Sequence, residues 1–347
     1  MLEADAEVDR REFTVRASLR LAPGDRLALF GPSGAGKTTL LELIAGLVAP
    51  RRARIALGGR LLTSTDKPVT AVPPWQRRVG LLRQDPGLFP HLSVRRNLLY
   101  ARSAAGRRSE LAELADALGI GGLLGAMPAR LSGGQQHRVA LGRLLLAHCE
   151  ALLLDEPYTG LDLSLRRGLT ELVVSLVDER RIPAILVAHE LADAQAFATI
   201  MAILDRGELL QFGAPDEVVR RPASRRVAEL VGYTAFVPVP GLDGAVAGVH
   251  PERMLSGRHP ESGLVLTGPV SACRPAGALW EVTVQAGGAG VTGRLAEPAE
   301  PGTELTVTAA GPPFFGPDGS ALGRAPQGTG LAGEATGRGS AAQAGPR

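Results

Sequence analysis

Short apolar runs alternate with helical patterns over the first 232 residues of the chain. Runs of this kind are typical of strands buried on both faces of a parallel sheet. The predicted strands are residues 27–30, 151–154 and 184–187. The predicted helices are residues 38–47, 107–118 and 163–179. This rhythm predicts an α/β domain with a largely parallel sheet at residues 1–232.

A different pattern follows Gly232, where short segments with a period of two are separated by Gly and Pro clusters. Such segments are typical of antiparallel strands. They are residues 264–267, 279–284, 291–295 and 304–308. We therefore predict a small all-β, barrel-like domain at residues 237–320. Residues 324–347 are rich in Gly, Ala, Pro and Ser and lack aromatic residues, so we predict that this tail is disordered.

The composition excludes several classes of protein. Hydrophobic residues make up 45% of the 347 residues, which is enough for a sizeable core. No apolar stretch is long enough to span a bilayer, and the acidic N-terminus predicts no secretory signal. The formal net charge is +3, and no segment is both strongly basic and aromatic-rich, so we expect no nucleic-acid partner. Cys149 and Cys273 are typical of a reducing compartment and are too few for a metal cluster.

The segment after the predicted strand 27–30 matches the pattern G-x-x-x-x-G-K-[ST] and opens the helix 38–47. In such a loop, backbone N–H groups and the helix N-terminus bind phosphate oxygens. We expect Lys37 to reach the β- and γ-phosphates and the Thr38 hydroxyl to ligate Mg²⁺. The phosphate-binding residues of this loop are Gly31, Pro32, Ser33, Gly34, Ala35, Gly36, Lys37, Thr38 and Thr39. Kinases and GTPases share the loop, so alone it indicates only a nucleotide site.

The basic residues of the chain draw attention to the same position. Only two of the 38 basic residues are lysines, Lys37 and Lys67, and the others are arginines. This bias is typical of a GC-rich coding sequence. The planar fork of arginine does not replace a compact ammonium among phosphate oxygens. Lysine at position 37 therefore supports the phosphate site, whereas Lys67 lies in a polar loop to which we assign no function.

A second acidic motif, Asp155-Glu156-Pro157, follows the predicted strand 151–154. An aspartate at the end of such a strand is placed to hold Mg²⁺ beside a nucleotide. Glu156, one residue further on, is placed to orient or deprotonate a water, and general-base catalysis contributes about 10²–10⁴ in rate. A strand that simply ends in a polar loop is the alternative.

The segment Leu131-Ser-Gly-Gly-Gln135 precedes another predicted helix and makes a second anion site. One nucleotide does not need two such sites from one domain, unless the second serves a neighbouring molecule. At this point the chain resembles the ATP-binding subunits of ABC transporters, whose signature matches residues 131–135. The resemblance covers residues 1–232 and predicts an α/β P-loop NTPase of the ABC type, with a mixed sheet and a helical subdomain.

The resemblance implies further residue roles. Two copies of the chain would sandwich ATP and Mg²⁺ between the phosphate loop of one copy and the signature of the other. Glu156, His189 and Gln84 would be catalytic, and Thr38, Gln84 and Asp155 would hold the metal. The nucleotide-binding residues supplied by the signature and the following loop would be Ser132, Gly133, Gly134, Gln135 and Asp162. The ATPase would lie peripherally at the cytoplasmic face of the cell membrane, against a permease that works with a substrate-binding protein.

Residues 73–80 and 84–94 look most like molybdate-type importers, and Phe89, Pro90 and His91 are candidate permease contacts. Residues 248–252 and 314–319 resemble TOBE-type regulatory domains of such importers, although residues 262–268 lack the oxyanion-binding run of molybdate-type subunits. The alternatives are import of sulfate, ferric iron, polyamine or sugar, a non-transport ABC ATPase of DNA repair or translation, and an oxyanion-sensing regulator.

Two positions depart from the family pattern. Arg83 precedes Gln84 where relatives often carry an aromatic or apolar residue, and the sequence offers no physical reason for the change. Phe13 is the candidate for stacking on adenine, although it lies closer to the phosphate loop than the family pattern suggests. A strand position in the core is the alternative for Phe13.

Overall fold

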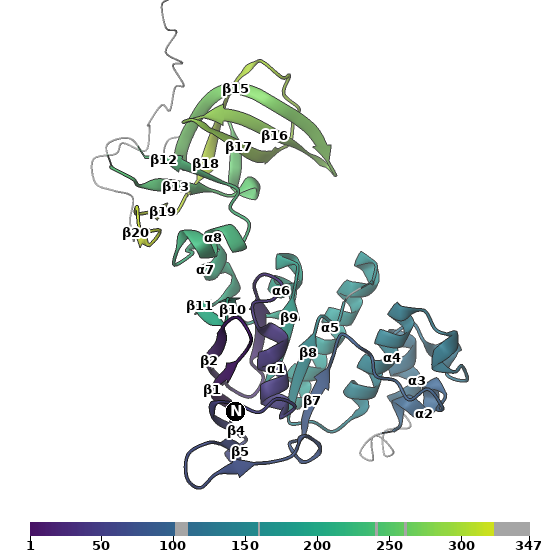
Figure 1. Ribbon diagram of the computed structural model, residues 1–347. Helices are drawn as coiled ribbons and strands as arrows, with labels where there is room; N and C mark the ends of the chain where they lie inside the picture. The colour runs from purple at the N-terminus through teal and green to yellow at the C-terminus, as the bar shows by residue number, and fades with distance from the viewer. Residues whose placement is uncertain (101–109, 159, 240–241, 260–261, 323–347) are drawn as a thin grey trace, which may run out of the picture. The chain divides into compact units, whose positions relative to one another are not determined.

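The computed structural model describes residues 1–100, 110–158, 160–239, 242–259 and 262–322 (Figure 1). Its contacts divide the chain into two units, Met1–Asp216 and Glu217–Arg347. The tail predicted to be disordered lies outside the described residues, as does the start of the helix predicted at 107–118. The domain limits inferred from the sequence, 1–232 and 237–320, stay a prediction.

A six-stranded sheet forms the centre of the first unit, with the order β11-β10-β3-β9-β8-β7. Strands β7, β8, β9, β3 and β10 are parallel, and β11 is antiparallel to β10. Their bounds are β3 Arg26–Phe30, β7 Val79–Leu82, β8 Ala151–Asp155, β9 Ala184–Ala188, β10 Ile200–Asp205 and β11 Glu208–Gly213. The three strands predicted from apolar runs are confirmed as β3, β8 and β9 of this parallel sheet.

A second, antiparallel sheet in this unit has the order β2-β1-β4-β5-β6 and was not predicted. Its strands are β1 Leu2–Asp9, β2 Thr14–Leu21, β4 Arg52–Leu57, β5 Arg60–Ser64 and β6 Thr70–Ala71. Strand β1 buries Leu2, Ala4, Ala6 and Val8 and turns the residues between them outward. This period of two was the signal in the sequence that could have revealed the strand.

The helices of the first unit come after the parallel strands β3, β7, β8 and β9 along the chain. They are α1 Lys37–Ala45, α2 Val94–Leu98, α3 Glu110–Ala117, α4 Gly133–Leu146, α5 Leu163–Arg180 and α6 Leu191–Phe197, with short 3₁₀ turns at Pro74–Gln76, Gly121–Leu123 and Pro128–Arg130. Helix α1 ends two residues before the predicted limit of 47. Gly46 adopts φ 81° and its N–H bonds the Leu43 and Glu42 carbonyls, which closes the helix.

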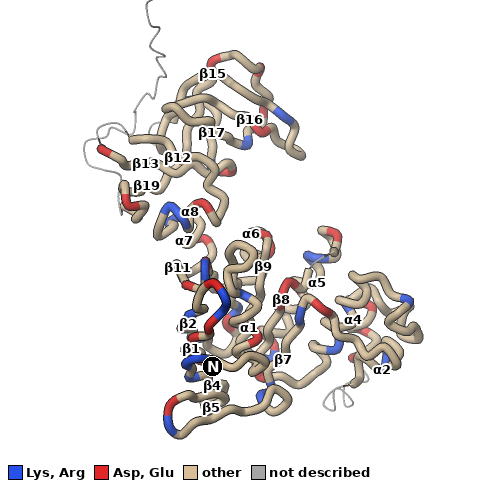
Figure 2. Tube along the Cα trace, in the orientation of Figure 1, with Lys and Arg blue, Asp and Glu red and all other residues tan. Residues whose placement is uncertain are grey.

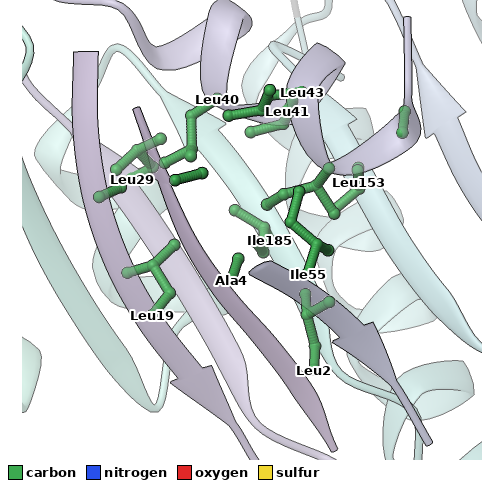
Figure 3. Packing of buried hydrophobic residues seen from close by; sticks show 14 of the residues in the cluster. Leu2, Ala4, Leu19, Leu29, Leu40, Leu41, Leu43, Ile55, Leu153 and Ile185 are labelled. Carbon is green, nitrogen blue, oxygen red and sulfur yellow. The ribbon is translucent and has the colours of Figure 1, made fainter. Parts of the chain in front are cut away.

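The main core of the first unit lies between the two sheets and around α1 (Figure 3). Leu40, Leu41 and Leu43 of α1 are at most 1% exposed and pack among side chains from both sheets. Each such buried side chain stabilises the fold by about 1.5–3 kcal/mol. This packing fixes the first residue of α1, and with it the end of the phosphate loop.

The second unit is built mainly from two sheets, with the orders β12-β13-β19-β20 and β14-β18-β15-β16-β17. The strands are β12 Ala235–Pro238, β13 Val246–Val249, β14 Met254–Ser256, β15 Gly263–Ala276, β16 Leu279–Ala286, β17 Ala289–Leu295, β18 Glu304–Ala310, β19 Phe314–Phe315 and β20 Ala321–Leu322. Helices α7 Pro215–Arg220 and α8 Arg225–Leu230 precede the strands, and Pro251–Arg253 forms a 3₁₀ turn. The β character predicted for this region is confirmed.

Strand β15 is much longer than the predicted segment 264–267. Its first half pairs with β18 and its second half with β16, with a register shift between Val270 and Ala272. At Gly268 a Cβ atom would lie 1.9 Å from the Gln285 carbonyl oxygen, so only glycine fits there. From the sequence, the Gly-Pro step is expected to end a strand. In the structure it lies inside β15, where the pairing partner changes from β18 to β16.

Charged residues of both signs are interspersed along each unit (Figure 2), as the small net charge suggests. None of the helices within the described ranges is both long and apolar enough to cross a membrane.

Candidate functional site

The loop between β3 and α1 lines a cavity of about 500 Å³. Two glycines fix its backbone. A Cβ on Gly31 would lie 1.9 Å from the Leu204 carbonyl oxygen, and one on Gly36 would lie 2.6 Å from a Val15 methyl group. Both glycines have φ values that L side chains rarely adopt, 152° and 105°. The loop therefore packs closely against β10 and β2, which fixes the path of its backbone beside the cavity.

Lys37 is the first residue of α1 and is only 5% exposed. Its Nζ donates hydrogen bonds to the carbonyl oxygens of Gly31 (2.8 Å) and Pro32 (2.9 Å). Burial lowers the pKa of Lys37, and the nearby carboxylates of Glu156 and Asp155 oppose that shift. The cavity thus contains a positive charge held by backbone carbonyls, as the sequence predicts for a phosphate site.

Thr38 and Asp155 meet beside the loop. The Thr38 hydroxyl donates a hydrogen bond to Asp155 Oδ2 over 2.8 Å, and Asp155 is 2% exposed. Asp155 Oδ1 is buried and finds no hydrogen-bond partner among the described residues. The pKa of Asp155 is raised mainly by burial, and the charges of Glu156 and Glu42 raise it further. A buried carboxylate oxygen with a free lone pair beside a hydroxyl suits a hard cation such as Mg²⁺.

The described residues contain no cluster of three His, Cys, Asp or Glu side chains that could hold a metal by themselves. A magnesium ion bound by Thr38 and Asp155 would therefore rely on phosphate oxygens and water for its other ligands, which is usual for Mg²⁺. The two protein groups fit that role.

The three predicted catalytic residues meet at the carboxyl ends of neighbouring parallel strands. Gln84 follows β7, Glu156 follows β8 and His189 follows β9. Gln84 Nε2 donates a hydrogen bond of 2.5 Å to Glu156 Oε1, and His189 Nε2 contacts the same oxygen. Glu156 has φ 52°, a left-handed conformation that is rare for residues other than glycine and common at functional sites. All three side chains line the cavity of the phosphate loop.

The signature residues lie elsewhere. Ser132 is the N-cap of α4, and its hydroxyl accepts a hydrogen bond from Gln135 N–H, while Gln135 Oε1 accepts one from Ser132 N–H. Gly133 and Gly134 line a second cavity of about 490 Å³, which Gln84 and Glu156 also border. Asp162 caps α5 by accepting a hydrogen bond from Leu165 N–H. Ser132, Gln135 and Asp162 line neither of these two cavities.

Some residues that line the cavities were not predicted. Arg10, Arg11 and Glu12 precede Phe13 in the turn between β1 and β2 and border the first cavity. This charged run in the sequence was the available signal. Phe13 lines the cavity and also packs against the core from the turn just before β2, so it is not a strand residue, and its stacking on adenine stays a prediction.

His137 of α4 borders the second cavity and had no signal of its own in the sequence. It is 7% exposed, and its Nε2 has no partner among the described residues.

The loop, the parallel strand order and the acidic pair at the end of β8 define an ABC-type P-loop NTPase fold. A dimeric structure of the ATP-binding cassette MJ0796 in a post-hydrolysis state with ADP and Pi has the same fold. It aligns with a TM-score of 0.53 and 24% sequence identity over 62% of this chain and 99% of that chain.

Sequence comparisons indicate the same class. Residues 15–159 match the sequence model of the ABC transporter family. The chain is 41% identical over 224 residues to the Fe(3+) ions import ATP-binding protein FbpC of Pseudomonas fluorescens, covering 64% of this chain and 62% of that protein. It is 42% identical over 222 residues to the molybdenum import ATP-binding protein ModC of Mesorhizobium japonicum, covering 62% of this chain and 60% of that one.

A third relative, the sulfate/thiosulfate import ATP-binding protein CysA 2 of Chromobacterium violaceum, is 40% identical over 238 residues, covering 67% of this chain and 63% of that protein. The matches thus span about three fifths of the length of these three relatives. These three relatives are import ATP-binding proteins for three different substrates.

Proposed function

We propose that this chain is the ATP-binding subunit of an ABC importer and hydrolyses ATP to ADP and phosphate to drive transport. The observation that carries the proposal is the meeting of Gln84, Glu156 and His189 in the lining of the phosphate-loop cavity. Phosphoryl transfer depends mainly on positioning and electrostatic stabilisation, and this cavity supplies groups for both.

Each residue has a distinct role in this proposal. Lys37 and the loop N–H groups bind the β- and γ-phosphates. Thr38, Gln84 and Asp155 would hold a magnesium ion, which would offset the charge of the phosphate oxygens. The Glu156 carboxylate accepts a proton from the attacking water. Gln84 Nε2 and His189 Nε2 hold the Oε1 atom of that carboxylate in place, as they do in the structure.

The signature residues act in a second copy of the chain. Ser132, Gly133, Gly134, Gln135 and Asp162 close the partner's cavity when two copies form a head-to-tail dimer around two ATP molecules. The separation of these residues from the first cavity supports the proposal, because one chain then holds two complementary half-sites. The dimer closes when ATP binds and opens after hydrolysis, as is typical of nucleotide-driven switches.

The decisive variant is Glu156→Gln, which keeps the shape of the side chain and removes the proton acceptor. ATP binding should persist, turnover should fall by about 10²–10⁴, and a dimer should accumulate on addition of ATP. The matched control is Glu150→Gln, because Glu150 lies just before the opposite end of β8 and pairs with Arg78. Turnover of Glu156→Gln at the wild-type rate would contradict the role of Glu156.

The permease is proposed to dock on a cleft of about 420 Å³ beside the Gln84 loop. Phe89 and Tyr100 pack ring against ring there, with centroids 3.9 Å apart, and the Arg143 guanidinium lies 5.3 Å from the Phe89 ring. Phe89, Pro90 and His91 remain the proposed contacts. With this docking the chain would lie at the cytoplasmic face of the membrane, and the permease would receive substrate from a binding protein on the opposite face.

We propose molybdate or a related oxyanion as the transported substrate, with residues 237–320 as a TOBE-like regulatory domain. The resemblance of residues 73–80 and 84–94 and the relatives' names support an importer of this group. Uptake of labelled molybdate, tungstate, sulfate and ferric iron should be compared in strains with and without the chain. Unchanged molybdate and tungstate uptake in the deletion strain would exclude molybdate and tungstate as substrates and favour iron or sulfate.

A further inference from the structure

Glu42 of α1 lies between two arginines from distant parts of the chain. Its Oε1 lies 3.1 Å from Arg83 Nη2, and its Oε2 lies 3.7 Å from Arg10 Nη2. The Glu42 side chain is 16% exposed, so this carboxylate is largely withdrawn from solvent. Arg10 also donates a hydrogen bond from Nε to the Thr39 hydroxyl over 2.9 Å. One acidic side chain on α1 thus joins the turn after β1 to the segment after β7.

Arg83 lies directly beside Gln84, just beyond the end of β7. Strand β7 ends at Leu82, so Arg83 and Gln84 are the first two residues beyond the hydrogen-bonded ladder. The pair with Glu42 connects this segment to the helix whose first residues are Lys37 and Thr38. Gln84 in turn donates its hydrogen bond to Glu156. The unusual arginine of the sequence therefore has a partner, and the partner lies on the phosphate-loop helix.

We propose that Arg83 is a positioning residue that, through Glu42, holds Gln84 at a fixed distance from the phosphate loop. This inference rests on the proposed ATPase function. Small misplacements of a positioning group are costly in rate, although a partly exposed ion pair is a weak restraint. Arg83 is 57% exposed, so the expected effect is moderate.

The first test is Arg83→Gln in the full chain, with steady-state ATP hydrolysis as the readout. The kcat should fall by about three- to fivefold, as expected for one partly exposed pair. The KM for ATP and the Tm should stay at wild-type values, because Arg83 lies outside the phosphate loop and its side chain is largely exposed. Arg83→Lys should recover most of the rate. The matched control is Arg78→Gln, which breaks the 2.8 Å pair with Glu150 before the other end of β7 and should leave kcat unchanged.

The second test asks whether the effect passes through Glu42. In a Glu42→Gln background, Arg83→Gln should lower kcat by no additional factor, because the tether is already broken. An equal further drop would show that Arg83 acts without Glu42 and would overturn the inference. A wild-type kcat in Arg83→Gln, or a lower Tm with unchanged kcat, would also overturn it while leaving the ATPase proposal intact. Absence of ATP hydrolysis by the wild-type chain would refute the proposed function itself, and the inference with it.

Discussion

The phosphate loop and the signature segment are both helix N-termini, but they satisfy their polar groups in opposite ways. At the phosphate loop, Lys37 is buried against carbonyl oxygens, and Asp155 Oδ1 is buried without a hydrogen-bond partner in the described part of the chain. At the signature, Ser132 and Gln135 exchange hydrogen bonds within one capping box. A Cβ on Gly133 would meet nothing within 4 Å. The phosphate-loop half-site has polar groups that are ready for a ligand bound by this chain. At the signature half-site the polar groups bond one another, and the open space at Gly133 can receive a ligand that another molecule holds.

Among the variants that distinguish the two half-sites, the largest effect is expected from Lys37→Arg, which preserves the charge and changes its shape. A planar guanidinium does not fit between the Gly31 and Pro32 carbonyls and the phosphates, so kcat/KM for ATP should fall by about 100-fold. Lys67→Arg, at the other lysine, should leave kcat/KM unchanged. A Lys37→Arg chain with more than half the wild-type kcat/KM would show that the loop is less selective than its burial implies.

Gly133→Asp addresses the signature half-site. The new side chain enters open space, and an acidic residue in the first turn of α4 suits the helix dipole, so the Tm should not fall. The carboxylate should repel the phosphates of a partner's ATP and reduce turnover by about tenfold, because it faces an anion site. ATP binding to the single chain should be normal. Weakened binding by the isolated chain would instead mean that the signature serves its own cavity.

The pH dependence of ATP binding should come from the phosphate-loop half-site and not from the signature half-site. Burial lowers the pKa of Lys37 below its ordinary value, so the free chain loses this proton earlier than an exposed lysine would. ATP binds the protonated form, and its affinity should therefore weaken as the pH rises through that lowered pKa. Equilibrium binding of ATP from pH 7 to pH 10 measures the effect. Gly133→Asp should keep the same alkaline decline, and a flat profile in the wild-type chain would contradict the role of the buried ammonium.

The smallest expected effect is that of Ser132→Ala, which removes one side-chain acceptor from the cap of α4. The free energy of unfolding should fall by about 1 kcal/mol, and ATP-induced dimerisation should weaken. Ser224→Ala removes a cap of the same kind from α8 in the second unit, where the Ser224 hydroxyl accepts a hydrogen bond from Val227 N–H. It should cost a similar amount without affecting dimerisation. Equal dimerisation defects in both variants would indicate general destabilisation.

The sequence predicted the features that depend on neighbouring residues. The phosphate loop, the apolar strand before Asp155 and the capping motif at Ser132 each occupy one short segment, so local spacing is sufficient to recognise them. Contacts between distant segments were not accessible in the same way. Arg83 and Glu42 lie on different elements, and only the packing of α1 against the sheet brings them together. The continuity of β15 was missed for a related reason, because a Gly-Pro step in the sequence is also typical of a turn between two strands.

The central claim is that each complete site takes its phosphate loop from one copy and its signature from another. Mixing Lys37→Arg chains with Gly133→Asp chains tests it directly, because each variant retains the half that the other lacks. ATP turnover by the mixture should exceed that of either variant alone, since a mixed dimer contains one intact pair of half-sites. Turnover equal to the average of the two separate variants would contradict the claim and would mean that each chain completes its own site.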